Sequence, residues 1–158
     1  MAAFCKGKLK EASLDFVFIF GILGAILGPL GAAQNYNAYP VLSFPNVVSN
    51  ITHSISGFTS LYIAISGMAS MKKKNQKFVY LILLSFCAAA YIANIIFDYN
   101  YMFLMGGDGT PYDVVYRFVN GNPVLYPLCV VALFLIYIAA FYQAYYLIQN
   151  KRAQKRAR

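Results

Sequence analysis

Residues 72 to 97, which read KKKNQKFVYLILLSFCAAAYIANIIF, decide the fold of this chain. A run of basic residues leads directly into a segment without a single charge, 78–97. Twenty residues of α-helix extend about 30 Å, which matches the hydrocarbon core of a bilayer. The segment 78–97 is therefore predicted to cross a membrane as a helix, with a basic cluster before its first residue.

The composition of the 158 residues supports the same class of protein. Hydrophobic residues make up 60% of the chain and charged residues 11%, whereas soluble domains carry about 25% charged residues. With 11 Gly, 6 Pro and 3 Cys, the chain has neither a collagen-like composition nor enough cysteine for a disulfide scaffold. We therefore predict an integral membrane protein with a single domain, residues 1–158.

The basic residues are concentrated in three short clusters, and the long intervals between the clusters are nearly uncharged. Each interval has room for two spans and a loop, and basic residues beside span ends favour the cytoplasmic side. We therefore predict an all-α bundle of four transmembrane helices with both termini on the cytoplasmic side, or on the matrix or stromal side in an organelle. The clusters are Lys6, Lys8 and Lys10; Lys72, Lys73, Lys74 and Lys77; and Lys151, Arg152, Lys155, Arg156 and Arg158.

The four predicted spans are 16–33, 54–71, 78–97 and 124–149, followed by a basic tail, 150–158. The last span would measure about 39 Å as a helix, so its final turns are expected to protrude from the bilayer. A cleaved signal peptide is the competing interpretation of the first thirty residues. Because their apolar run is longer than that of a usual signal peptide, we expect the first span to be retained.

Small residues recur at intervals of three or four in the first three spans, which places them on one face of each helix. In lipid, such faces allow two helix backbones to approach closely. The face of the first span is expected either to pack within the bundle or, through Gly24 and Gly28, to pair with another chain. Phe18 is expected to point to lipid and Asn94 to bond another helix. The packing candidates are Gly21, Gly24, Gly28, Gly31, Ser56, Ser60, Gly67 and Asn94.

The two outer loops carry local signals of different kinds. Residues 34–53 interleave aromatic residues with prolines, which predicts a compact apolar loop, and Asn50-Ile51-Thr52 matches a glycosylation acceptor. In the second loop, Thr110-Pro111-Tyr112-Asp113 resembles a helix start and Asn120-Gly121 a helix stop. A short interfacial helix, 111–119, is therefore predicted, with Asp113 and Arg117 close enough to pair.

The sequence offers no pattern of catalytic or metal-binding residues. His53 is the single histidine, and Cys5, Cys87 and Cys129 have no paired spacing. Cys5 lies near basic residues at a predicted membrane surface and is a candidate for lipidation. We therefore expect no enzyme activity, no cofactor and no metal.

The basic clusters indicate contact with an anionic inner leaflet rather than with nucleic acid, because they lie beside spans. In size and plan the chain resembles the tetraspan proteins of the MARVEL or claudin type. The resemblance covers topology alone, since the chain has no Trp and no cysteine in either outer loop, and it implies no functional residue. The residues expected to contact anionic lipid are Lys72, Lys73, Lys74, Lys151 and Arg152.

Two functions fit these features. One is a non-enzymatic tetraspan protein of the plasma membrane or endomembranes that organises the membrane or partner proteins. The other is an accessory subunit of a large membrane complex, for example in an organellar inner membrane. An acid-poor, Arg-rich transit peptide is not evident in the first fifteen residues, which favours the first function.

Overall fold

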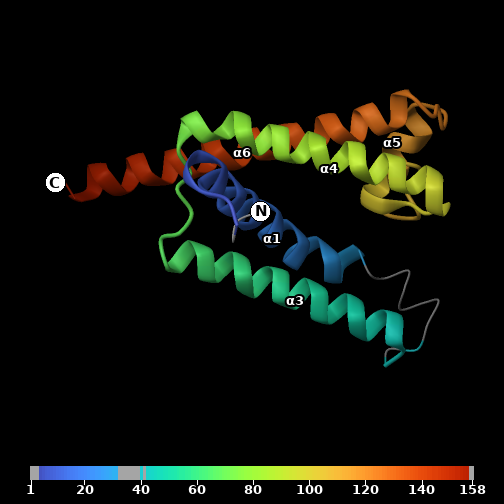
Figure 1. The fold of residues 1–158 in the computed structure, drawn as a ribbon, viewed down its shortest axis with the longest axis horizontal. Helices are drawn as coiled ribbons and strands as arrows, with labels where there is room; N and C mark the ends of the chain where they lie inside the picture. The colour runs from blue at the N-terminus through green and yellow to red at the C-terminus, as the bar shows by residue number, and fades with distance from the viewer. Residues whose placement is uncertain (1–3, 32–39, 41, 157–158) are drawn as a thin grey trace. The chain divides into compact units, whose positions relative to one another are not determined.

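The computed structural model describes residues 4–31, 40 and 42–156 (Figure 1). These residues form helices and connecting segments, and no strand occurs among them. The chain divides into two compact units, Met1–Val79 and Tyr80–Arg158, and each is described by itself.

The first unit is built on two long helices, α1 (Gly7–Gly31) and α3 (Phe44–Ile65). The helices lie side by side and antiparallel, because Ser60 reaches the carbonyl of Phe18 while His53 lies beside Gly28. After α3 the chain passes through a short 3-10 helix, η1 (Lys73–Asn75), and enters α4 (Gln76–Phe97). The start of α4 belongs to the first unit and the rest of it to the second.

Helix α3 differs from the span expected at 54–71. It begins at Phe44, so the loop expected over 34–53 is wrong from residue 44 onward. Pro45 occupies the first turn, where a missing N–H is not a loss. The helix ends at Ile65 in a Schellman motif, with Gly67 at φ +69° and the amide of Met68 donating to the carbonyl of Ile63 over 3.0 Å.

The second unit contains the rest of α4, the 3-10 helix η2 (Tyr101–Phe103), α5 (Tyr112–Phe118) and α6 (Leu125–Arg156). Helix α5 begins and ends one residue inside the predicted range, and its N-cap is Pro111 rather than Thr110. The stop predicted at Asn120-Gly121 is confirmed, because the amide of Gly121 donates to the carbonyl of Tyr116 over 2.8 Å. Helix α5 then packs against α6.

Within the described part of the chain, three stretches are long and apolar enough to cross a membrane, namely Gly7–Gly28, Lys73–Phe97 and Leu125–Arg156. The membrane class predicted from composition is thereby supported. Helix α3 is not one of the three, because polar residues recur along it. Helix α6 continues seven residues beyond the predicted end at 149, so the basic tail is helical as far as Arg156.

Candidate functional site

The glycine face of α1 lies directly against α3. A Cβ added at Gly21 would lie 2.7 Å from the carbonyl oxygen of Ser56 and 2.8 Å from the Cβ of Ser60, closer than real side chains approach. At Gly28 an added Cβ would overlap the imidazole of His53. Glycine is therefore required at two levels of the contact, about two helical turns apart.

The contact is reciprocal, since α3 also contributes a glycine. A Cβ added at Gly57 would lie 2.6 Å from the Cβ of Ala25 on α1. Gly24 is looser, with an added Cβ 3.6 Å from His53 Nδ1. We call this contact, formed by Gly21, Gly24, Ala25 and Gly28 with His53, Ser56, Gly57 and Ser60, the α1–α3 seam.

A buried hydrogen bond crosses the seam. The hydroxyl of Ser60, which is fully buried, donates to the carbonyl of Phe18 over 2.5 Å. Phe18 itself is buried, so the expectation that it points to lipid is wrong. The turn of α1 that carries Phe18 lies in the seam, and its neighbour Ile19 is also buried.

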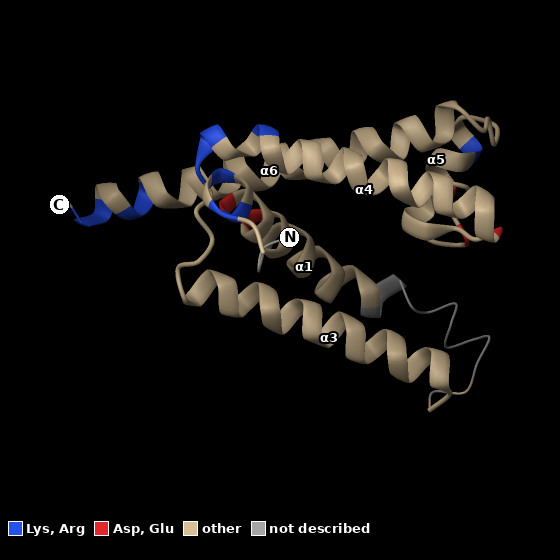
Figure 2. Ribbon diagram, viewed as in Figure 1, with Lys and Arg blue, Asp and Glu red and all other residues tan. Residues whose placement is uncertain are grey.

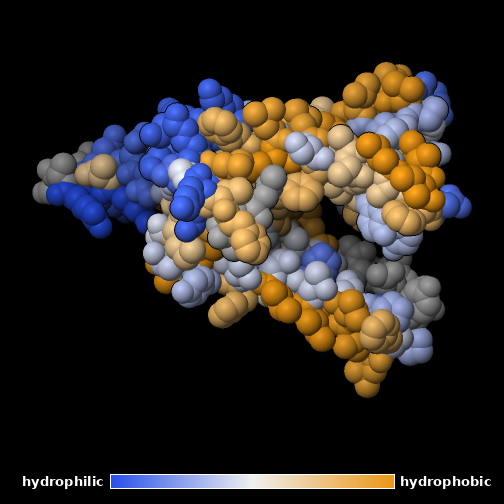
Figure 3. All heavy atoms as spheres, viewed as in Figure 1, coloured by the Kyte–Doolittle hydropathy of each residue, from blue (hydrophilic) through white to orange (hydrophobic). Residues whose placement is uncertain are grey.

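Helix α3 has two unlike sides. Its polar and small residues face α1 across the seam, whereas large apolar side chains cover the opposite side (Figure 3). His53, Ser56 and Ser60 of α3 are therefore turned toward α1, whereas Thr52 and Ser54 are exposed. The exposed side chains on the outer side include Ile51, Ile55, Phe58, Leu61, Tyr62 and Ile65.

At one end of the seam, a buried carboxylate binds the connection between α3 and η1. Asp15 of α1 is fully buried, and its Oδ1 accepts hydrogen bonds from the backbone amides of Ser70 (2.7 Å) and Met71 (2.9 Å). Its Oδ2 accepts a third from the hydroxyl of Ser70 (3.1 Å). Met71 has a φ of +45°, which non-glycine residues rarely adopt, so the carboxylate holds a strained backbone in place.

Glu11, one turn before Asp15, makes a second link to the same connection. Its Oε1 pairs with Lys72 Nζ at 2.7 Å, and its Oε2 accepts from Asn75 Nδ2 at 2.7 Å. The amide of Asn75 also donates to the hydroxyl of Ser70 over 3.0 Å. We call Glu11, Asp15, Ser70, Lys72 and Asn75 the basal polar cluster. Sequence analysis missed it, although an acid close to the start of an apolar run was a visible signal.

In the second unit, asparagine side chains close the turns after α4. Asn94 is buried, and its side chain accepts from the amide of Tyr101 over 2.6 Å and donates to the carbonyl of Tyr101 over 3.1 Å. Its expected bond to another long helix is therefore wrong, because its partner is the backbone of the following 3-10 helix. Asn100 bonds the carbonyl of Gly106 (2.8 Å) and the carboxylate of Asp108 (2.7 Å) in the same manner.

Aromatic side chains fix α5 on this unit. The ring of Tyr112 stacks on Phe103 at 5.3 Å and meets the edge of Phe134 of α6 at 6.1 Å. Tyr116 meets Tyr126 edge to face at 5.1 Å. Burial raises the pKa of the Tyr112 phenol, because the charged form loses its hydration there.

The remaining predicted residues lie in varied places. Gly67 is a turn residue outside the seam, with open space around an added Cβ, so its expected packing role is wrong. Gly31 is the last residue of α1, and its surroundings lie outside the described part of the chain.

Asn50 lies within α3 rather than in a loop, and Asp113 and Arg117 form no ion pair in the described structure. Cys5 is a half-buried free thiol, whereas Lys72, Lys73, Lys74, Lys151 and Arg152 are exposed.

These arrangements hold backbone rather than present reactive groups. Among the described residues, no group of three or more His, Cys, Asp or Glu side chains could hold a metal ion. No protein-family model, curated protein or solved structure matches the chain.

Replacing Gly28 by Leu should destabilise the protein, because the larger side chain would displace His53 and separate α1 from α3. We expect a loss of about 1 to 3 kcal/mol, as for other overpacked sites. Ala64→Leu is the matched control, since Ala64 lies on the same pair of helices but is exposed. Thermal unfolding in one detergent compares the two variants, and equal midpoints would contradict a tight seam at Gly28.

Replacing Asp15 by Leu should release the connection between α3 and η1. Hydrogen bonds to a charged group contribute about 1.5 to 3 kcal/mol each, and the leucine accepts none. Hydrogen exchange at the amides of Ser70 and Met71 should become faster. Asp15→Asn keeps one acceptor oxygen and should have a smaller effect. Unchanged exchange in the leucine variant would show that the carboxylate does not hold this connection.

Proposed function

We propose that the chain is a non-enzymatic, four-span integral membrane protein that organises anionic lipids and partner membrane proteins through its helix surfaces. In the proposed topology, both termini and the turn at residues 72–77 lie on the cytoplasmic side. The observation that carries the proposal is the position of the basic residues, which stand at helix ends and leave long apolar helix surfaces between them.

The two-sided character of α3 supports a fourth span. Its 22 residues extend about 33 Å, enough to cross the hydrocarbon core. Its seam side is satisfied by α1, and its outer side is apolar. Since α3 lies antiparallel to α1, a membrane crossed by α1 would be crossed again, in the opposite direction, by α3.

The exposed basic residues support the orientation. In Figure 2, the ribbon is coloured for Lys and Arg at the beginning of α1, around the connection into α4 and at the end of α6. Helix α6 has 32 residues and measures about 48 Å, so about 18 Å of it extends past a core of about 30 Å. That extension carries Lys151, Arg152, Lys155 and Arg156, where the positive-inside rule applies.

The surface properties support an organising role. Outward-facing apolar side chains cover the long helices, while Ser60 of the seam and Asp15 of the basal polar cluster bond to the protein's own backbone. The apolar helix surfaces of such a chain are available for contact with lipids and with other helices. Van der Waals packing of helix surfaces is the principal force of association in a bilayer.

The proposed topology predicts the side from which single cysteines are labelled in a protein without native cysteines. Cysteines at Lys6, Lys74 and Lys155 should react from one side of sealed vesicles, and cysteines at Leu42 and Asp108 from the other. All five positions are exposed. Labelling of Leu42→Cys from the same side as Lys74→Cys would exclude a crossing by α3 and leave three spans.

The proposed lipid contact predicts a charge-dependent lipid preference. In nanodiscs with equal phosphatidylserine and phosphatidylcholine, Lys73→Gln with Lys74→Gln should reduce the phosphatidylserine retained in native mass spectrometry several-fold. Each basic residue near an anionic leaflet contributes about 1 kcal/mol. The double Lys→Arg variant keeps the charge and is the matched control. An unchanged lipid ratio in the glutamine variant would contradict the proposed contact.

A further inference from the structure

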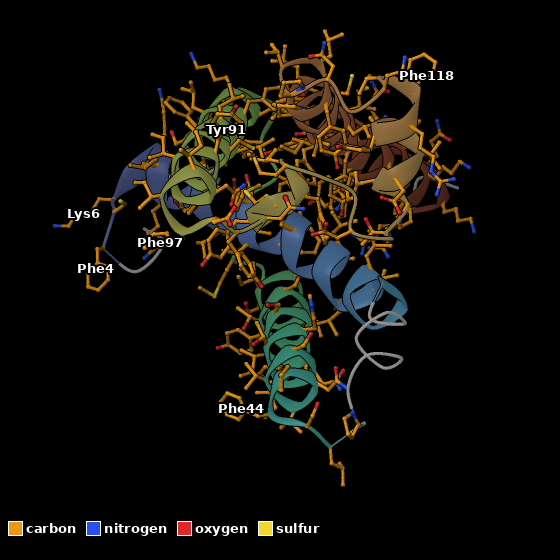
Figure 4. The ribbon with its side chains drawn as sticks, turned by 90° about the vertical axis from the view of Figure 1, so that its right-hand side faces the viewer. Phe4, Lys6, Phe44, Tyr91, Phe97 and Phe118 are labelled. Carbon is orange, nitrogen blue, oxygen red and sulfur yellow. The ribbon has the colours of Figure 1, made fainter. Side chains whose placement is uncertain are left out.

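Helix α5 is short, and its two faces differ. The inner face carries Tyr112 and Tyr116, whose rings contact Phe103, Phe134 and Tyr126. The outer face carries Val114 and Phe118, which lie one turn apart and are 72% and 85% exposed. Figure 4 shows Phe118 at the edge of the structure, pointing away from the ribbon.

The outer face is a fixed feature because the end of α5 is closed by hydrogen bonds. The amide of Asn120 donates to the carbonyl of Arg117 (3.0 Å) and that of Gly121 to the carbonyl of Tyr116 (2.8 Å). Immediately afterwards, the side chain of Asn122 accepts from the amides of Val124 and Leu125, both at 3.0 Å, at the start of α6. The exposed apolar pair is therefore positioned by the same turn that starts an apolar helix.

A cation flanks the apolar pair. Arg117 adjoins Phe118, is exposed, and forms no ion pair among the described residues, although Asp113 lies one turn away. A guanidinium beside an exposed aromatic side chain matches the boundary of a bilayer, where the lipid phosphates lie next to the headgroup-proximal ends of the acyl chains.

We propose that α5 is an interfacial anchor: Val114 and Phe118 insert into the outer leaflet at the level of the lipid headgroups, and Arg117 binds lipid phosphate. The occupant of this face is lipid rather than a protein, for two reasons. Two side chains fall far short of the roughly 1,000 Å² that a stable protein interface buries. Exposed apolar residues also follow α5 within a few positions along the chain, namely Val124 and Leu125, where α6 begins.

Tryptophan fluorescence tests the anchor directly, because the chain contains no tryptophan. The full chain with Phe118→Trp is reconstituted into phosphatidylcholine vesicles that carry bromine near the headgroup end or near the far end of the acyl chains. We expect this variant to lose most of its emission with bromine near the headgroups, less with bromine at the chain ends, and little with aqueous iodide. Val114→Trp should show the same quenching pattern as Phe118→Trp. Agreement between the two variants would show that the pattern is not a local effect of one substitution.

Two control positions separate this inference from the proposed membrane topology, on which it rests. Ile136 is exposed about three turns into α6, so Ile136→Trp reports insertion of the span itself. Gln154 is exposed on the extension of α6, so Gln154→Trp reports contact with water. Quenching by bromine in the Ile136→Trp variant but not in Phe118→Trp would overturn the anchor alone, whereas no quenching in either variant would overturn both proposals.

The quenching pattern of Phe118→Trp also shows whether water or protein, instead of lipid, surrounds this face. Strong quenching by iodide with none by bromine would place the face in water and overturn the anchor. Protection from both quenchers would show that protein covers the face, such as a second copy of the chain, and would overturn it equally. Quenching by headgroup-proximal bromine at both 114 and 118 supports it.

Discussion

The close approach of α1 and α3 is the constraint on which the first unit depends. In the proposed topology lipid surrounds both helices, so burial of apolar surface between them contributes little, and their association depends on backbone contact and hydrogen bonds. Gly21, Gly28 and Gly57 remove the side chains that would separate the two backbones, and Ser60 bonds the carbonyl of Phe18 across the gap. Once the backbones are this close, the polar side of α3 has to face α1, and its apolar side is left outward.

Backbone groups are the partners of nearly all the buried polar side chains described above. Asp15 receives two amides of the connection to η1, Asn94 closes on the amide and carbonyl of Tyr101, and Ser60 bonds a helix carbonyl. A polar group without a partner costs several kcal/mol in an apolar environment. Asp15 and Asn94 thus satisfy turns at helix ends, and Ser60 bonds a carbonyl within α1, so each of these buried polar side chains has a structural partner.

Local sequence signals predicted the helices whose ends are decided locally. The uncharged run before Asp98 predicted α4 to within two residues, and the Pro111 and Asn120-Gly121 signals predicted α5. The start of α3 differs from the prediction because Pro45, which the prediction places in a loop, suits the first helical turn. The end of α6 was missed because Lys, Arg, Gln and Ala are good helix formers, and positive charge at a helix C-terminus is favourable.

The candidate sites were less predictable because they depend on contacts between distant parts of the chain. Spacing placed the glycines on one face of α1 but could not show which helix that face meets, and no periodicity indicates that Asp15 bonds Ser70, 55 residues away.

The two ends of the helices are held by different chemistry, and in the proposed topology this difference determines how each end meets the membrane. At the basal polar cluster, Lys72 pairs with Glu11, and the neighbouring residues Lys73 and Lys74 are exposed. At the other end, neutral asparagine side chains close the turns, and the exposed residues of α5 are largely apolar. Electrostatic attraction to an anionic leaflet weakens with salt and reaches about a Debye length. Insertion of apolar side chains into a leaflet requires contact and does not depend on lipid charge. In the proposed topology, the cytoplasmic end can therefore select lipids by charge, while insertion of Val114 and Phe118 fixes the depth of α5 without dependence on lipid charge.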